Sequence, residues 1–184
     1  MAFFTGKGDS GTTKLFDSAK GVRESKSSPV FEVLGTLDEL NTLIGWCKVA
    51  ARTTYFGKQG CADLLHDIQD CVFTLQAEVA GAAKSIPEKT VTEVERIIKE
   101  IESQLPPVTS FLVPGGTELS ARLDMARAVS RRCERRLVAL KESGERKIGE
   151  HSMQYANRLS SLLYALVRAV NFQSGAAEAP PSYR

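Results

Sequence analysis

The chain has 184 residues, of which 42% are hydrophobic and 25% are charged, and its formal net charge at pH 7 is only +2. This size suits one domain with a single core, and the balance of apolar and charged residues excludes a disordered chain. The near-neutral charge argues against nucleic-acid binding through a broad basic surface, and no apolar run approaches the roughly 20 residues that a membrane-spanning helix needs.

Residues 1–28 have the composition of loops and turns. Gly6, Gly8, Gly11 and Gly21 stand among many Ser, Thr and Lys residues, without the periodicity of a helix or strand. The start of the chain lacks the basic and apolar regions of a secretory signal. We expect this arm to be ordered only where it docks on something.

The next part of the chain contains five segments with helical periodicity, in which apolar residues recur at the spacing of one buried helix face. Pro29 suits the first turn of the first helix, and the Pro106-Pro107 pair must end the third. Thr117 is a candidate N-cap of the fourth. We expect helices over approximately 29–57, 63–83, 91–105, 118–143 and 148–172.

Strand patterns are nearly absent, so the sequence predicts an all-α fold, a five-helix bundle of the up-down, ferritin-like type with an N-terminal glycine-rich arm. The last segment is rich in Ala, Glu and Pro, and we expect residues 175–184 to be a flexible tail. The chain is thus expected to be a single domain, with residues 1–28 as the arm and residues 29–174 as the bundle.

Cysteine and histidine give no sign of a metal site. The four cysteines contain no C-x-x-C pair and lie in predicted helices or at their edges, at Cys47, Cys61, Cys71 and Cys133. We expect reduced core thiols of a cytosolic protein, with disulfides or zinc ligation as alternatives. His66 and His151 are isolated, without further ligands at the spacing of a zinc site.

The arm holds a candidate phosphate-binding segment, T-G-K-G-D-S-G-T-T at residues 5–13. Glycines let backbone amides turn towards an anion, Lys7 adds charge, and the hydroxyl groups can donate to phosphate oxygens or approach a metal. The segment is not a Walker A loop, since no G-K-[ST] sequence leads into a helix. A flexible arm without a ligand is the alternative.

A polar stripe is predicted on the fourth helix. At about 100° per residue, Arg131 and Glu134 lie within about 40° of Arg127 around the helix axis, and Asp124 lies within about 60°. Two arginines four residues apart repel each other unless an anion or carboxylates compensate them. The stripe is therefore a candidate triphosphate clamp, with a solvated charged face as the alternative.

Two further segments place polar residues inside apolar helices. Asp38 and Asn41 are poor interior helix residues, which suggests that a partner holds them, such as an arginine of the fourth helix. An exposed polar turn is the alternative. Asn157, in the last helix, offers both a donor and an acceptor, as needed to fix an adenine edge or a ribose hydroxyl.

Taken in order, these segments resemble the signature of the PduO-type ATP:cob(I)alamin adenosyltransferases over nearly the whole chain. The order of the motifs is more specific than any one of them. Besides the arm, the matching stretches are Lys26 after G-V-R, G-T-x-D-E-L-N at 35–41, F-x-x-P-G-G at 111–116, A-R and R-R-C-E-R within 126–135, and N-R-L-S at 157–160.

The resemblance implies an enzyme that transfers the 5′-deoxyadenosyl group of ATP to the cobalt of cob(I)alamin, giving adenosylcobalamin and triphosphate. It implies a homotrimer in which the arm of one subunit and the fourth helix of its neighbour hold MgATP, with the corrinoid above it. Mg²⁺ would come with ATP and not from protein side chains. The residues implied in ATP binding are Thr5, Gly6, Lys7, Gly8, Asp9, Gly11, Thr12, Thr13, Lys26, Arg127, Arg131, Glu134 and Asn157.

The same resemblance implies three catalytic residues. Arg127 would pair with Asp38 across the subunit interface, and Phe111 would displace the lower axial ligand of cobalt, with Ser160 also at the corrinoid. Arg131 would contact phosphates. Co(I) is itself a strong nucleophile, so the protein needs no general base and must instead position ATP in line and stabilise the leaving triphosphate.

Three positions depart from the usual pattern of that family. Asp124 stands where His is usual, Ser161 where Asp is usual, and Cys133 where Ala is usual. Asp124 places a negative charge beside Arg127 and can compete with Asp38 for it. Core packing should tolerate Cys133, because the change is small.

Two alternatives belong to other functional classes. One is a non-catalytic ATP- or corrinoid-binding carrier of the same fold, and the other is a helical interaction protein, which would need neither the arm nor Asn157. As partners the resemblance suggests a flavoprotein reductase and a B12-dependent acceptor enzyme, with no nucleic acid and no membrane. The expected location is the cytoplasm, with a mature organellar form as the alternative.

Overall fold

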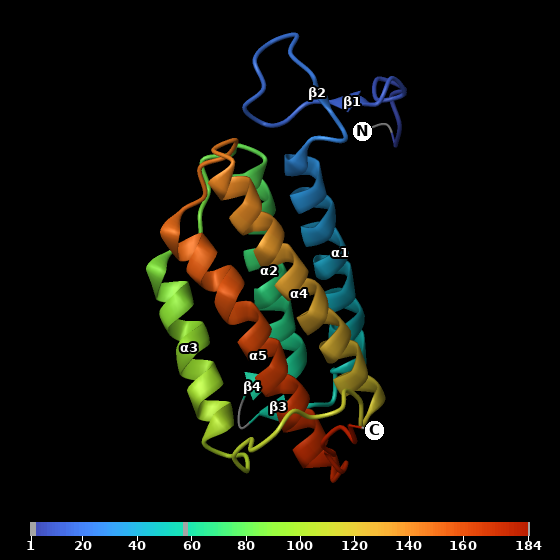
Figure 1. Ribbon diagram of the computed structural model, residues 1–184, viewed down its shortest axis with the longest axis vertical. Helices are drawn as coiled ribbons and strands as arrows, with labels where there is room; N and C mark the ends of the chain where they lie inside the picture. Colours follow the sequence, from blue (N-terminus) through green and yellow to red (C-terminus); the bar gives the residue numbers. More distant parts are fainter. Residues whose placement is uncertain (1–2, 57–58, 184) are drawn as a thin grey trace.

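The computed structural model describes residues 3–56 and 59–183, which form an all-α bundle with two very short β-ribbons (Figure 1). This confirms the predicted fold class. The elements in chain order are β1 (Thr12–Thr13), β2 (Glu24–Ser25), α1 (Pro29–Ala50), β3 (Tyr55–Phe56), β4 (Gln59–Gly60), α2 (Cys61–Val79), α3 (Glu88–Glu102), α4 (Glu118–Glu142) and α5 (Glu150–Ser174).

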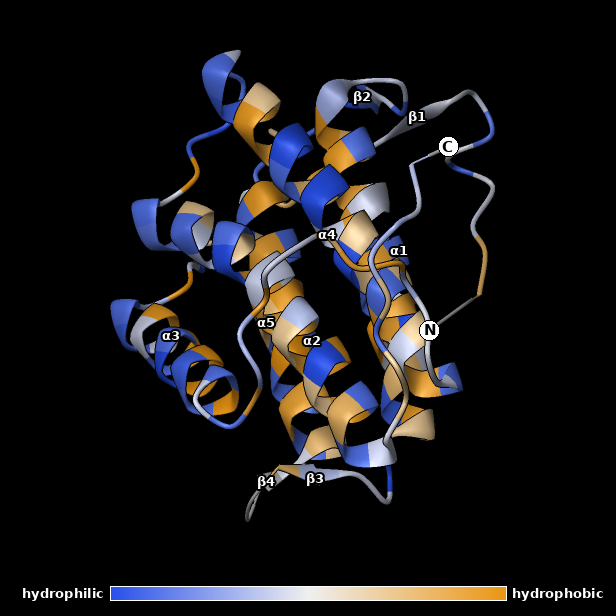
Figure 2. Ribbon diagram, turned by 60° about the horizontal axis from the view of Figure 1, so that its bottom comes forward, coloured by the Kyte–Doolittle hydropathy of each residue, from blue (hydrophilic) through white to orange (hydrophobic). Residues whose placement is uncertain are grey.

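The helices pack around one continuous core. α1 lies against α2 and α4, and α5 lies against α4 and α3. Leu40 and Ile44 of α1, Leu137 of α4 and Leu163 of α5 are fully buried in this core. Hydrophobic residues face inward on each helix, and the outer side of α3 is mostly hydrophilic (Figure 2). Burial of these apolar faces is what holds the bundle together.

Local signals set several helix ends. Thr117 caps α4 as predicted, since the Ser120 amide donates to Thr117 Oγ1 at 3.1 Å and the Ser120 hydroxyl accepts from the Thr117 amide at 2.8 Å. α1 ends at Ala50, earlier than expected. The reason is the antiparallel ribbon of β3 and β4, in which Tyr55 pairs with Gly60 and draws the chain out of the helix.

The N-terminal arm has more structure than the sequence suggested. β1 pairs with β2 antiparallel, with Thr12 opposite Ser25. Arg23 fastens this ribbon, donating from Nε to Thr12 Oγ1 at 2.8 Å and from a terminal nitrogen to the carbonyl oxygens of Lys7 and Thr12 at 2.7 and 2.6 Å. Hydrogen bonds within the arm therefore help to shape it, and the expectation that it becomes ordered only on docking stays a prediction.

The arm is attached to the end of the bundle at which α1 begins (Figure 1). Leu15 is buried there, and the amide of Phe16 donates to the carbonyl of Ala80 at 2.8 Å. Arg146, in the connection between α4 and α5, forms ion pairs with Asp17 and Glu24 of the arm. The loop between α3 and α4 runs along the opposite end of the bundle.

The C-terminal segment folds back on the bundle. The amide of Val113 donates to the carbonyl of Ala179 at 2.9 Å, and the carboxylate of Glu178 accepts from the buried Arg168 at 2.6 Å. This ion pair and the backbone hydrogen bond join the described part of the tail, up to Tyr183, to the rest of the protein, and the flexibility expected of residues 175–184 stays a prediction.

Candidate functional site

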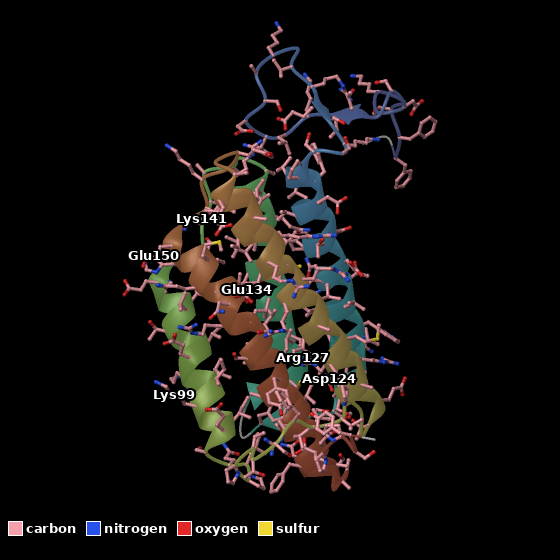
Figure 3. All side chains as sticks on the ribbon, viewed as in Figure 1. Lys99, Asp124, Arg127, Glu134, Lys141 and Glu150 are labelled. Atoms are coloured by element: carbon pink, nitrogen blue, oxygen red, sulfur yellow. The ribbon has the colours of Figure 1, made fainter. Side chains whose placement is uncertain are left out.

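The polar stripe predicted on α4 exists, and its first two members form an ion pair (Figure 3). Arg127 Nε donates to Asp124 Oδ1 at 2.8 Å, and the two side chains are 26% and 9% exposed. The Arg127 guanidinium also lies 6.0 Å from the centroid of the Tyr164 ring, in the range of a cation–π contact. Asp124 and Tyr164 therefore fix the direction of this cation.

The other end of the stripe connects α4 to α5. Asn157 Nδ2 donates to Glu134 Oε1 at 2.6 Å, and Asn157 Oδ1 accepts from Arg158, which in turn donates to Glu95 at 2.8 Å. The exposed Arg131 has no side-chain hydrogen bond or ion pair within the described ranges, 3–56 and 59–183. Arg131 is thus the cation of the polar stripe that is free, among the described residues, to bind an anion.

A cleft of about 960 Å³ opens beside this stripe. One wall comes from the loop between α3 and α4, a second from α4 and α5, and a third from the C-terminal segment. The cleft is large enough for a cofactor-sized ligand. Its lining residues are Val108, Thr109, Ser110, Phe111, Leu112, Arg127, Arg131, Ser160, Ser161, Tyr164, Pro180, Pro181 and Tyr183.

The cleft brings together four of the residues that the sequence singled out. Arg127 and Arg131 supply two cations, Phe111 is 81% exposed, and Ser160 lies on the α5 wall. An exposed aromatic ring beside two guanidinium groups can contact an apolar ligand face while the cations bind an anion. Ser161, one of the departures, also lines this wall.

Sequence reasoning missed two parts of the cleft. Tyr164 lies four residues after Ser160, so helical spacing could have placed both on the α5 face that carries Asn157. The C-terminal wall, with Pro180 and Tyr183, gave no such signal. A segment without periodicity carries no information on where it folds back.

Asp38 and Arg127 do not meet within one chain. Asp38 is exposed on α1, and its side chain has no hydrogen bond or ion pair with any described residue. Glu39, the next residue, pairs with Arg132 of α4. Within one chain, an arginine of α4 thus pairs with Glu39 and not with Asp38, because Glu39 is turned towards α4.

Asn41, the other polar residue singled out on α1, is buried at 5% exposure. Its carbonyl oxygen accepts from Gln69 Nε2 at 3.1 Å. Its Oδ1 atom has no hydrogen-bond partner among the described residues. Within one chain, the partner expected for the Asn41 side chain is thus not found among the described residues.

The glycine-rich segment forms two tight turns. Gly6 and Gly11 have φ angles of +67° and +76°, which favour glycine, and the amides of Asp9 and Gly11 donate to the carbonyls of Gly6 and Gly8 at 3.2 and 3.1 Å. Lys26 Nζ donates to the Gly8 carbonyl at 3.0 Å. Lys26 therefore contacts this segment, and its role in ATP binding stays a prediction.

Residues 3–170 match the family model described as cobalamin adenosyltransferase. The match includes the arm, the loop that carries Phe111, the polar stripe of α4 and Asn157 of α5. The chain belongs to this family.

Members of the family with curated names are similar over nearly all of this chain. Corrinoid adenosyltransferase PduO of Citrobacter freundii is 40% identical over 176 residues, 92% of this chain and 50% of that protein. Corrinoid adenosyltransferase of Bacillus subtilis (strain 168) is 35% identical over 182 residues, 95% of this chain and 89% of that protein. The chain spans about half the length of the PduO proteins that it matches.

The fold agrees with a solved family structure. A phenylalanine-to-alanine variant of the PduO-type ATP:corrinoid adenosyltransferase from Lactobacillus reuteri, complexed with cobalamin and ATP, matches with a TM-score of 0.87 and 26% identity. The match covers 99% of this chain and 100% of that one. The five-helix architecture is therefore that of the family.

Cysteine and histidine play no part in the cleft of this family member. All four cysteines are free, and burial raises the pKa of Cys133 to about 12. Among the described residues no group of three His, Cys, Asp or Glu side chains has the arrangement of a metal site. His66 contacts Lys48, and His151 contacts Gln154. None of the described helices is long and apolar enough to cross a membrane.

Proposed function

We propose that the protein transfers the 5′-deoxyadenosyl group of ATP to the cobalt of cob(I)alamin, forming adenosylcobalamin and triphosphate. The observation that carries this proposal is the cleft in which Phe111 stands beside Arg127 and Arg131. An apolar ring suits a corrinoid face, and two guanidinium groups suit the triphosphate that leaves. The curated names of the relatives support the same reaction.

The chemistry asks little of the protein beyond positioning and charge. The electron pair of Co(I) forms the Co–C5′ bond while the C5′–O bond breaks, and the electrons of that bond leave on the triphosphate. No proton and no external electron are needed in this step. Arg127 and Arg131 would stabilise the negative charge that develops on the leaving group, an interaction that strengthens in the transition state.

Phe111 would act on the cobalt side. An exposed ring at the edge of the cleft would exclude a water or base ligand from the lower face of cobalt, and four-coordinate Co(II) is easier to reduce. Ser160, 8% exposed on the α5 wall, would contact the corrinoid. Reduction to Co(I) would then depend on a flavoprotein reductase, and the product would pass to a B12-dependent acceptor enzyme.

We further propose that the ATP site is completed by a second subunit. The arm and the Phe111 loop lie at opposite ends of the bundle, so the arm of one chain is turned away from its own cleft (Figure 1). The Asp38 carboxylate has no ion-pair partner among residues 3–56 and 59–183 and is available to a neighbouring subunit. Trp46, Val49 and Met125 are 47%, 57% and 53% exposed on α1 and α4, which is apolar surface that an interface would cover.

In the homotrimer that we propose, one subunit would supply the arm, and its neighbour would supply the polar stripe of α4 and Asn157 of α5. Gly-rich turns would present backbone amides and hydroxyls to the phosphates of MgATP, and the amide of Asn157 would contact adenine or ribose. The arm residues are Thr5, Gly6, Lys7, Gly8, Asp9, Gly11, Thr12, Thr13 and Lys26, and the helix residues are Arg127, Arg131, Glu134 and Asn157. The free buried thiols suit the reducing cytoplasm in which we place the reaction.

An anaerobic assay tests the reaction. Chemically reduced cobalamin and MgATP are mixed with the protein, and loss of the Co(I) absorption band is followed with chromatography of adenosylcobalamin. Phe111→Ala should lower transfer from cob(II)alamin with a reductase by about hundredfold while retaining more activity with preformed cob(I)alamin. Phe73→Ala, which removes a 61% exposed ring from α2, is the matched control. Absence of product with the wild-type protein would reject the proposal.

Mixed oligomers test the shared site. Lys26→Ala and Arg127→Ala should each be nearly inactive alone, but unfolding and refolding them together should restore part of the activity, because some interfaces then contain both intact residues. A site within one chain would give no recovery. Sedimentation that finds only monomers with full activity would also reject the shared site.

A carrier without turnover is the second candidate, and the Asp124–Arg127 ion pair is the observation that favours it. If Asp124 keeps the guanidinium from the triphosphate, the protein would bind ATP and corrinoid without reaction. Calorimetric binding of both ligands with no adenosylcobalamin formed would support the carrier.

A further inference from the structure

Three polar side chains join the end of α5 to two segments that wall the cleft. Arg168 and Asn171 are 7% and 3% exposed, and they lie about one helical turn apart. Both donate to the carboxylate of Glu178, Arg168 Nε to Oε2 at 2.6 Å and Asn171 Nδ2 to Oε1 at 3.3 Å. We call Arg168, Asn171 and Glu178 the α5 clamp.

The α5 clamp also holds both ends of the loop that carries Phe111. A terminal nitrogen of Arg168 donates to the carbonyl of Pro106 at 3.1 Å, and Asn171 Nδ2 donates to the carbonyl of Gly115 at 3.1 Å. Pro106 lies four residues after the end of α3, and Gly115 lies three residues before the start of α4. The two ends of the loop are therefore tied to α5 through partly buried hydrogen bonds, one of them from a charged donor.

A backbone contact then links the middle of the loop to the C-terminal segment. The Val113 amide donates to the Ala179 carbonyl at 2.9 Å, one residue after Glu178. Pro180 and Pro181 follow and line the same cleft as Arg127. Proline fixes its own φ, so a segment anchored at Glu178 continues in a restricted direction.

The burial of Arg168 makes this arrangement specific. Its side chain is 9% exposed and the Glu178 side chain is 20% exposed, so little water can replace the carboxylate. Moving the C-terminal segment away would leave a guanidinium group unpaired in the bundle. The carboxylate thus binds the C-terminal segment to the same two α5 side chains that hold the loop.

We infer that Glu178 is a positioning residue, which through Arg168 and Asn171 holds the Phe111 loop and the C-terminal segment as the corrinoid wall of the cleft. This inference rests on the proposed function in assigning the corrinoid to that wall. The residue touches neither substrate in this role. It acts by setting where Phe111 stands relative to the cations of α4.

Hydrogen exchange of the full chain, followed by mass spectrometry, tests the clamp independently of turnover. Glu178→Ala should speed exchange in peptides covering 106–116, where the Val113 amide loses its fixed acceptor, and leave α1 unchanged. Glu178→Gln should give a smaller effect, because it keeps one acceptor. The control is Glu102→Gln, an exposed carboxylate at the end of α3 whose side chain has no hydrogen bond or ion pair with the described residues. Exchange unchanged in Glu178→Ala would overturn the inference.

Kinetics then test positioning. Glu178→Ala should raise the KM for cob(I)alamin by about tenfold and leave the KM for ATP within about twofold. It should also lower the fraction of cob(II)alamin that shows the four-coordinate absorption and EPR signals. Faster loop exchange with both KM values unchanged would overturn the positioning role. If the wild-type protein forms no product, the proposed function fails, whereas the exchange experiment still decides whether the clamp exists.

Discussion

Arg127→Ala removes the cation that compensates a buried carboxylate. The Asp124 side chain is only 9% exposed, and Arg127 lies at 2.8 Å from it. Breaking a fully buried pair costs about 3–5 kcal/mol, because the remaining charge is left uncompensated. Since Arg127 itself is 26% exposed, we expect about 2–3 kcal/mol. For a chain of this size that loss lowers Tm by about 5–10 °C.

A second substitution separates stability from chemistry. Asp124→Asn in the Arg127→Ala background removes the uncompensated charge, so most of the lost Tm should return. Transfer should not return, because the cation beside the triphosphate is still missing. We expect a loss of at least about hundredfold in kcat/KM for both variants.

Thermal melts followed by circular dichroism and the anaerobic transfer assay measure the two effects. Arg135→Ala, which changes an exposed arginine on the same helix, is the control and should leave both unchanged. A Tm of Arg127→Ala within about 1 °C of wild type, or a double variant no more stable than the single one, would refute the ion-pair argument. Transfer within about threefold of wild type would remove Arg127 from the mechanism.

Three further outcomes are expected. Arg23→Ala, which removes the hydrogen bonds that fasten β1 to the start of the arm, should raise the KM for ATP by about tenfold with little change in Tm, and an unchanged KM would separate the arm from ATP binding. Gly116→Ala should lower Tm and disturb the cleft, since φ is +126° and an added Cβ would lie 2.5 Å from Asn171 Oδ1; a melt equal to wild type would contradict this. Burial raises the pKa of Cys47 to about 11 and the pKa of Cys133 to about 12 from 9.0, so the free energy of unfolding should fall as pH rises above 9, where unfolded thiols ionise first. Urea unfolding at pH 8 and pH 10 measures this, and the fall should be smaller in Cys133→Ala.

The residues that carry strong local signals were predictable. Thr117 begins α4 because its side chain caps the next turn, and the 3.6-residue period placed Arg127, Arg131 and Glu134 along one side of α4. The end of α1 was not predictable, because the two-residue ribbon at Tyr55 has too little pattern to compete with helical periodicity. The hairpin in the arm was missed for the same reason.

The sequence by itself determined the five helices, their buried faces and the order of the family's motifs, because these depend on residues close together in the chain. Only the tertiary structure decided which polar groups meet. It pairs Arg127 with Asp124 and Glu39 with Arg132, leaves Asp38 unpaired among the described residues, and ties the C-terminal segment to α5. Contacts of this kind depend on where separate elements pack in space, and the rotation of one helix by a single residue changes which side chain faces its neighbour.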